Sequence, residues 1–172
     1  MIIIDFEASS LRKNSYPIEV AWGERPEAIE SFLLNPDYMD GWTDWNPKSF
    51  EYHGISREKL RQEGIDPRLA AQKMIQDLAG REVYSDEPGY DTRWKNRLLA
   101  DSGFEPSLVR ILDLNLYLKK MIKTAPGSKT FDDYICEFTC SKTVRRHRAA
   151  EDVFWLLEFV AYIRQCLCQQ PE

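Results

Sequence analysis

The first seven residues constrain this chain more than any other stretch. They read Met1-Ile-Ile-Ile-Asp5-Phe-Glu7, and three consecutive β-branched residues predict a short buried strand over residues 2–6. Because strand side chains alternate between two faces, Asp5 and Glu7 point the same way. Neighbouring carboxylates at the end of a buried strand repel each other and are costly to remove from water. A hard cation such as Mg²⁺, which prefers carboxylate oxygen, relieves both costs, so the pair predicts half of a metal site.

Strand and helix patterns divide the rest of the chain. Residues 18–23 and 28–34 follow the first strand through short turns, so the three are expected to form an antiparallel meander. Residues 82–85 and 108–112 are predicted as further strands, and the first of these is expected to run parallel to residues 2–6 because a helix precedes it. Helices are expected to begin at residues 56, 67, 91, 113, 131 and 149.

The order of these elements predicts the fold class. Three antiparallel strands followed by alternating helices and strands indicate an α/β fold, a five-stranded mixed sheet flanked by helices. Residues 35–55 carry Trp42, Trp45 and other aromatics without a repeating pattern, so we expect a long ordered loop there. At 172 residues the chain is expected to form one domain, residues 1–172, with a substantial core.

Composition and charge narrow the classes of function. The net charge is −5, which argues against a general nucleic-acid coat but not against a nuclease whose acids are masked by metal. No apolar run approaches the ~20 residues of a membrane span, and the N-terminus lacks the basic region of a signal peptide, so we expect a cytoplasmic protein. The cysteines do not have zinc-ribbon spacing and are expected to be reduced thiols that fill the core; they are Cys136, Cys140, Cys166 and Cys168.

Two further acids and a histidine are candidates for the other half of the metal site. Metal-assisted phosphoryl transfer requires carboxylates that converge from separate elements. Asp91 follows the fourth predicted strand and shares a helix face with Trp94, so it is expected to look inward. Asp152 lies near the start of the last helix, just before its apolar stripe. His147 is expected on the loop before that helix, where a proton carrier can move with substrate.

Each of these residues also has a simpler interpretation. Asp5 and Glu7 could cap a strand and face solvent, and Asp91 could be the N-cap of its helix. Asp152 could be an ordinary acid in the first turn of a helix, favoured by the helix dipole. His147 lies in a basic run, residues 142–148, that could be a solvated loop.

Three segments, in this order, resemble the DnaQ-like exonucleases that have an Asp-Glu-Asp-Asp core and a histidine general base (DEDDh). They are Asp-Phe-Glu at 5–7, Tyr-Asp at 90–91 and His-Arg-Ala-Ala-Glu-Asp at 147–152. The sister branch has tyrosine where this chain has Arg148, so the histidine branch fits better. The resemblance covers nearly the whole chain. It implies an RNase H-like fold, two Mg²⁺ or Mn²⁺ ions, and 3′–5′ hydrolysis of single-stranded DNA or RNA to nucleoside 5′-monophosphates.

The resemblance also implies roles for single residues. The metal ligands would be Asp5, Glu7, Asp91 and Asp152, and His147 would accept a proton from the attacking water. A segment of small residues followed by leucine would touch the terminal nucleotide; here it is Ala8, Ser9, Ser10 and Leu11. His53 and Ile55 belong to a His-Gly-Ile segment that would line the same pocket, and Arg146 would bring phosphate to the acidic site.

One departure and several alternatives stay open. The second family motif usually has a His-Asn stretch before its aspartate, whereas this chain has Ser85-Asp-Glu-Pro-Gly-Tyr-Asp91, so Asp86 competes with Asp91 as the ligand. The alternatives are a non-catalytic nucleic-acid or protein-binding module on the same fold, and an endonuclease of the RNase H kind. The choice between DNA and RNA depends on 2′-hydroxyl contacts that no motif places. Association as a homodimer or with a partner protein is also left open.

Overall fold

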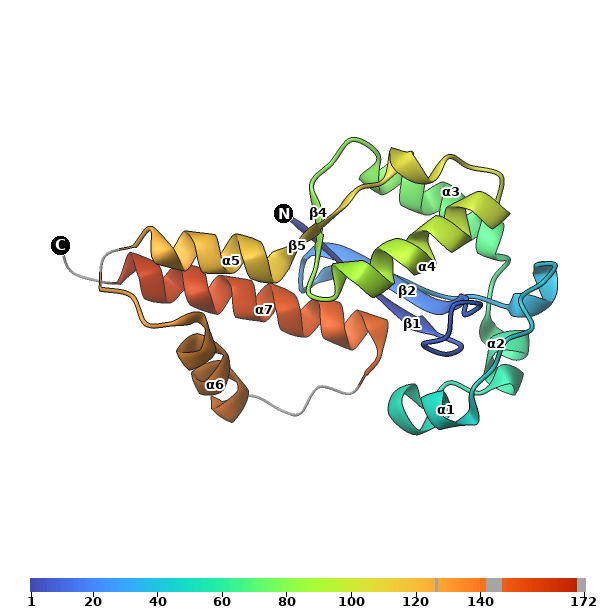
Figure 1. The fold of residues 1–172 in the computed structure, drawn as a ribbon, viewed down its shortest axis with the longest axis horizontal. Coiled ribbons are helices and arrows are strands. Elements are labelled where there is room, and N and C mark those ends of the chain that lie inside the picture. The colour runs from blue at the N-terminus through green and yellow to red at the C-terminus, as the bar shows by residue number, and fades with distance from the viewer. Residues whose placement is uncertain (126, 142–146, 170–172) are drawn as a thin grey trace.

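The computed structural model describes residues 1–125, 127–141 and 147–169. Its centre is a five-stranded sheet with the order β3-β2-β1-β4-β5 (Figure 1). The strands are β1 Ile2–Ala8, β2 Pro17–Arg25, β3 Ala28–Leu33, β4 Val83–Ser85 and β5 Ile111–Asp113. The helices are α1 Pro47–His53, α2 Arg57–Glu63, α3 Pro67–Leu78, α4 Pro88–Asp101, α5 Leu114–Lys123, α6 Phe131–Ser141 and α7 Ala149–Cys168, with short 3₁₀ turns η1 Pro36–Tyr38 and η2 Pro106–Leu108.

The pairing of the strands confirms the predicted fold class. β1 pairs antiparallel with β2, and β2 pairs antiparallel with β3, as expected for a meander. β4 lies on the other side of β1 and runs parallel to it, and β5 runs parallel to β4. A crossover through helices is required to bring β4 back parallel to β1, and α1, α2 and α3 lie in that connection.

Strand β1 is buried on both faces, and its alternating side chains belong to two cores. Ile2, Ile4 and Phe6 join a core with residues of α3 and α4. Ile3 points to the opposite face and joins a second core with residues of α5, α6 and α7. Asp5 and Glu7 continue the Ile3 side, because they are two and four residues further along the strand. Helix α7 packs against β1 and β2 (Figure 1). The second core contains residues of α7, so the two acids, which continue the Ile3 side, lie on the face that α7 covers.

The structure corrects the expectation of an irregular segment over residues 35–55. That segment contains η1 and the helix α1. The Asn46 side chain caps α1 by accepting a hydrogen bond from Lys48 N at 3.1 Å, Pro47 occupies the first turn, and Gly54 ends the helix at φ 65°. These are ordinary helix start and stop signals, which the aromatic content of the segment obscured.

Two other local predictions need correction. Helix α4 begins at Pro88 rather than at Asp91, because proline fits the first helical turn, so Asp91 is a buried first-turn residue and not the N-cap. The fifth strand covers residues 111–113, and Leu108, where it was predicted to begin, ends the 3₁₀ turn η2. All four cysteines are free, as expected, but the prediction that they fill the core is wrong for Cys136, Cys140 and Cys168, which are exposed.

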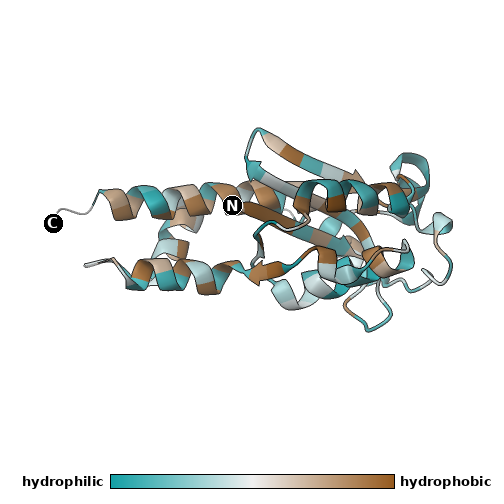
Figure 2. Ribbon diagram, turned by 90° about the horizontal axis from the view of Figure 1, so that it is seen from above, coloured by the Kyte–Doolittle hydropathy of each residue, from teal (hydrophilic) through white to brown (hydrophobic). Residues whose placement is uncertain are grey.

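The helices carry both hydrophobic and hydrophilic residues along their length (Figure 2). Within the described ranges, no helix combines the length and the apolar character needed to cross a membrane.

Candidate metal centre and adjoining cavity

Three acids meet on the face of the sheet that α7 covers. Asp5 and Glu7 come from β1, and Asp152 comes from the first turn of α7. Each offers a carboxylate oxygen, and these atoms all lie within 4.8 Å of one another. Asp5 and Asp152 are buried and Glu7 is partly exposed. Packing of α7 on the end of β1 therefore brings together acids that are almost 150 positions apart in the sequence.

Asp91 lies next to this group but is not one of the three acids whose oxygens lie within 4.8 Å of one another. It is buried in the first turn of α4, and the Ser85 hydroxyl donates a hydrogen bond to Asp91 Oδ2. Ser85 in turn accepts a hydrogen bond from Glu87 N at 2.9 Å, so the hydroxyl is oriented from both sides. Among the neighbouring charges that raise the pKa of Asp5, Asp91 acts most strongly and Asp86 least. Of the two competing acids, Asp91 is therefore the one whose charge acts more strongly on Asp5.

The surroundings of Asp5 match the chemistry of a cation ligand. Burial raises the pKa of Asp5 well above its ordinary value, and the charges of Asp91, Glu7 and Asp152 raise it further. Asp5 Oδ2 is buried and has no hydrogen-bond partner among the described residues. A buried carboxylate oxygen without a donor is costly, and a hard divalent cation would remove that cost. The acids described here therefore fit a metal ion.

A cavity of about 580 Å³ opens beside Glu7. Its walls come from the end of β1 and the turn after it, from α1, from α4, and from His147. The lining residues are Glu7, Ala8, Ser10, Leu11, Arg12, Asn46, Lys48, Ser49, Tyr52, His53, Trp94 and His147. The cavity is therefore lined both by Glu7, one of the three clustered acids, and by most of the residues that the family resemblance assigns to substrate binding.

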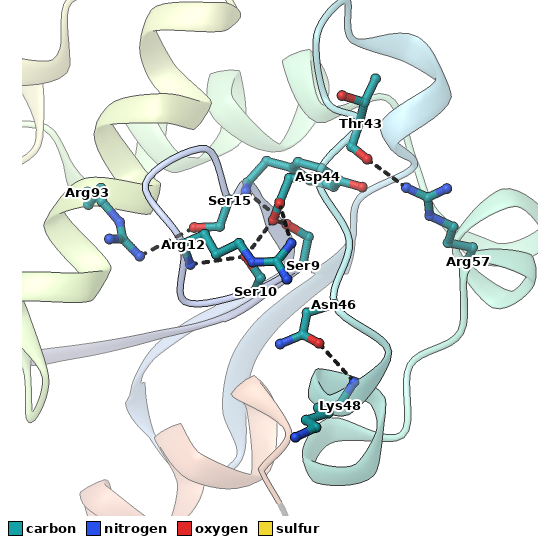
Figure 3. A network of polar contacts seen from close by, with 11 residues as sticks. Ser9, Ser10, Arg12, Ser15, Thr43, Asp44, Asn46, Lys48, Arg57 and Arg93 are labelled. Atoms are coloured by element: carbon teal, nitrogen blue, oxygen red, sulfur yellow. Dashed lines mark hydrogen bonds and ion pairs between the residues drawn. The ribbon is translucent and has the colours of Figure 1, made fainter.

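The turn after β1 is held on two sides (Figure 3). The Ser10 hydroxyl donates to Asp44 Oδ2, and Arg12 Nη1 lies 3.4 Å from Asp44 Oδ1. On the opposite side, Arg93 Nη2 donates to the Leu11 carbonyl at 3.3 Å. These contacts fix the backbone while the Leu11 side chain stays 65% exposed. The result is an apolar side chain presented at the cavity by a braced turn.

His53 lines the cavity with a buried, neutral ring. It is only 5% exposed, and its Nδ1 accepts a hydrogen bond from Ile55 N at 3.0 Å. Burial lowers the pKa of His53 to about 4, so the ring is neutral at pH 7. Because Nδ1 is an acceptor, the proton of the neutral ring is on Nε2. Nε2 is buried and has no partner in the described part of the chain.

His147 lies outside α7, as expected from its spacing to Asp152. It is exposed, its ring is nearly perpendicular to the Tyr52 ring with the two centroids 6.0 Å apart, and both residues line the cavity. Its φ of 48° is in the left-handed region, which is uncommon for residues with a β-carbon but is adopted by histidine more often than by most. Arg146, predicted to bring phosphate, lies outside the described residues.

Two predicted substrate residues lie behind the cavity wall. Ser9 is fully buried, and its hydroxyl accepts a hydrogen bond from Tyr16 N at 3.1 Å. Ile55 is fully buried in the core beneath α1. Neither of them is among the lining residues, so any effect of theirs on a ligand is exerted through Ser10 and His53.

The sequence motifs do not include Glu19 or Tyr52, and they place Arg148 in a basic run without identifying its partner. Tyr52 is an exposed aromatic of α1 at the cavity. Glu19 is a buried acid of β2 that pairs with Arg148, next to His147. A signal for Glu19 was present, because it interrupts an apolar strand pattern between Ile18 and Val20. Its partner could not be identified from local spacing.

The strand order and the flanking helices define an RNase H-like α/β fold, with acids of the first strand and the last helix gathered on one face of the sheet. Solved structures of exonuclease I share this fold. A zinc-bound complex of E. coli exonuclease I with single-stranded DNA superposes with a TM-score of 0.72 at 13% identity, over 98% of this chain and 41% of that protein.

Two more solved structures extend the comparison. The E. coli enzyme in complex with a dA16 oligonucleotide has a TM-score of 0.70 at 13% identity, over 95% of this chain and 40% of that one. Exonuclease I from Methylocaldum szegediense has a TM-score of 0.70 at 14% identity, over 99% and 41%. This chain thus spans about two fifths of these proteins. No protein-family model matches the sequence, and no curated protein matches it.

Proposed function

We propose that this chain is a metal-dependent exonuclease that degrades single-stranded nucleic acid from its 3′ end and releases nucleoside 5′-monophosphates. The observation that carries the proposal is the meeting of Asp5, Glu7 and Asp152 beside a cavity that His147 lines. The exonuclease I fold supports it, since solved structures of that enzyme include complexes with single-stranded oligonucleotides.

The four acids of the site would hold two metal ions. Asp5, Glu7 and Asp152 would share one Mg²⁺ or Mn²⁺ ion, and Asp91 together with Asp5 would hold a second. Ions of this kind supply Lewis acidity that activates water and stabilises the leaving 3′-oxygen. Ser85 keeps Asp91 oriented toward Asp5, because its hydroxyl is fixed by Glu87 N.

The remaining residues bind the substrate and move the proton. His147 accepts the proton of the attacking water, and its exposed position outside α7 allows the ring to close on a bound strand. Leu11 and Ala8 contact the base and sugar of the terminal nucleotide across the cavity, and Ser10 holds the turn that carries them. His53 forms part of the wall that faces that nucleotide. Ser9 and Ile55 support this wall from behind, and Arg146 approaches the phosphates.

A nuclease assay tests the proposal. Oligodeoxynucleotides and matched oligoribonucleotides, labelled in one set at the 5′ end and in another on internal phosphates, are incubated with Mg²⁺, and the products are resolved by length. The expected result is stepwise shortening from the 3′ end with release of 5′-mononucleotides, and loss of this activity in Asp5→Asn. A 3′-phosphate should block the reaction. Internal cuts in the blocked strand would indicate an RNase H-type endonuclease, and binding without hydrolysis would indicate a non-catalytic module.

A further inference from the structure

Glu19 is a buried carboxylate next to the proposed metal centre. In the antiparallel register of β1 and β2 it lies directly opposite Glu7, so the two side chains share the face that α7 covers. It is 2% exposed. A buried acid at this position requires partners, because an uncompensated charge beside three other carboxylates is strongly disfavoured.

Both oxygens of Glu19 are bound from the start of α7. Arg148 Nη2 lies 2.6 Å from Glu19 Oε1, and Arg148 Nε lies 3.0 Å from Oε2, which is a two-point contact between guanidinium and carboxylate. Ala149 N also donates to Oε2 at 3.0 Å. Glu19 is therefore engaged by protein donors and is not one of the residues in the metal-ligand group.

The same contacts cap α7. Arg148 is the N-cap residue of this helix and makes no capping hydrogen bond with its own side chain. Ala149 N is the first amide of the helix, and Glu19 supplies its acceptor from β2. A negative charge at a helix N-terminus is favourable. Asp152 N donates to the Arg148 carbonyl at 2.8 Å, so the turn that carries Asp152 is tied to the clamped residue.

The clamp also adjoins His147. This residue directly precedes Arg148 and has the left-handed φ of 48°. A chain that is pinned at Arg148 and Ala149 limits the directions in which His147 can leave the helix. One carboxylate thus holds the segment between the proposed proton acceptor and a proposed metal ligand.

We propose that Glu19 is a positioning residue that, through Arg148 and Ala149, sets the placement of Asp152 and His147 for metal binding and hydrolysis. This inference rests on the proposed function for its catalytic part. Residues that orient metal ligands without touching the metal commonly change affinity or activity by about 10- to 100-fold when they are replaced.

The test compares Glu19→Gln with Glu24→Gln. The control has the same substitution on the same strand, and Glu24 also pairs with an arginine, Arg81, but at an exposed site. Mn²⁺ binding is measured by EPR of the free ion, and kcat and KM are measured on a single-stranded oligonucleotide at a temperature where circular dichroism shows each variant folded. Glu19→Gln is expected to weaken Mn²⁺ binding and lower kcat by about 10- to 100-fold with little change in KM. Glu24→Gln is expected to match the wild type.

A second variant keeps the proposal testable if Glu19→Gln does not fold. Arg148→Lys retains the positive charge but replaces the planar fork by a single ammonium. Lower Mn²⁺ affinity and lower kcat in Arg148→Lys support the clamp. Wild-type values in the folded Glu19→Gln protein, or in Arg148→Lys where that alone folds, overturn it. If the wild type releases no mononucleotides, the proposed function fails, and the Mn²⁺ measurements still decide whether Glu19 positions Asp152.

Discussion

Glu7 and Glu19 are direct neighbours across β1 and β2, yet their carboxylates have different partners. Glu7 offers an oxygen to the group formed with Asp5 and Asp152. Glu19 is bound by Arg148 and by the first amide of α7. Like charges placed opposite each other in a sheet are unfavourable, so each acid requires its own compensation. Arg148 compensates Glu19 and its charge also acts on Glu7, and under the proposed function a bound cation would add to the compensation of Glu7.

Metal binding should raise the stability of the fold. Mg²⁺ or Mn²⁺ that binds the folded chain stabilises it by about 2.7 kcal/mol at a concentration 100 times the dissociation constant. We expect the thermal midpoint of the wild type to rise with added metal. Asp5→Asn removes a buried charge that its neighbours disfavour, so its metal-free form should be at least as stable as the wild type and should respond little to metal. An equal metal-induced rise in Asp5→Asn would exclude Asp5 as a ligand.

The pH dependence of stability should report on His53. Its pKa in the folded state is lowered to about 4 from an ordinary value of 6.5. Between these values the unfolded chain binds more protons at this site than the folded chain, so its contribution to the unfolding free energy falls as the pH drops through this window. The loss at this site is at most about 3 kcal/mol.

Denaturant unfolding of wild type and His53→Asn between pH 7 and pH 4 measures that contribution. Asparagine keeps an acceptor near Ile55 N but does not titrate, and the carboxylates that titrate in the same range are common to both proteins. As the pH falls, the free energy of unfolding of the wild type should decrease more than that of His53→Asn. A constant difference would show that His53 titrates normally.

Ser85 should matter through Asp91. Ser85→Ala removes the hydroxyl that donates to Asp91 Oδ2, leaving a buried carboxylate with one donor fewer. We expect a decrease in kcat of about 10- to 100-fold on an oligonucleotide, as for other residues that orient metal ligands. Ser107→Ala, at an exposed position in η2, is the control and should retain wild-type rates. A kcat in Ser85→Ala that equals the value in Ser107→Ala would show that Ser85 does not contribute to catalysis.

Leu11 should contribute to substrate binding and not to folding. Leu11→Ala changes a side chain that is 65% exposed, so the free energy of unfolding should change by less than about 0.5 kcal/mol. The KM for a single-stranded oligonucleotide should rise, because the cavity loses its apolar contact. Leu116→Ala is a matched control: Leu116 is 66% exposed on α5 and does not line the cavity. A KM in Leu11→Ala that equals the control value would contradict the role.

The local pattern of the chain was sufficient to predict much of the fold. Three β-branched residues predicted a strand over residues 2–6 with Asp5 and Glu7 on one side, and the structure has a strand over Ile2–Ala8 with both acids on the α7 face. Short turns predicted the antiparallel meander, and the helix before β4 predicted its parallel pairing. Helix α1 was missed although Asn46, Pro47 and Gly54 were visible, because the aromatic residues of the segment were interpreted as a loop.

By itself, then, the sequence determined which faces are apolar, where most helices begin, and that Asp5 and Glu7 share a side, because these properties depend on residues only a few positions apart. Tertiary structure alone decided that Asp152 joins these acids and that Arg148 pairs with Glu19 across 129 positions. It also decided that the charge of Asp91 acts on Asp5 more strongly than that of Asp86. Such pairs depend on strand register and on the packing of α7 against the sheet. Those are set by the summed burial of two cores, which no local spacing records.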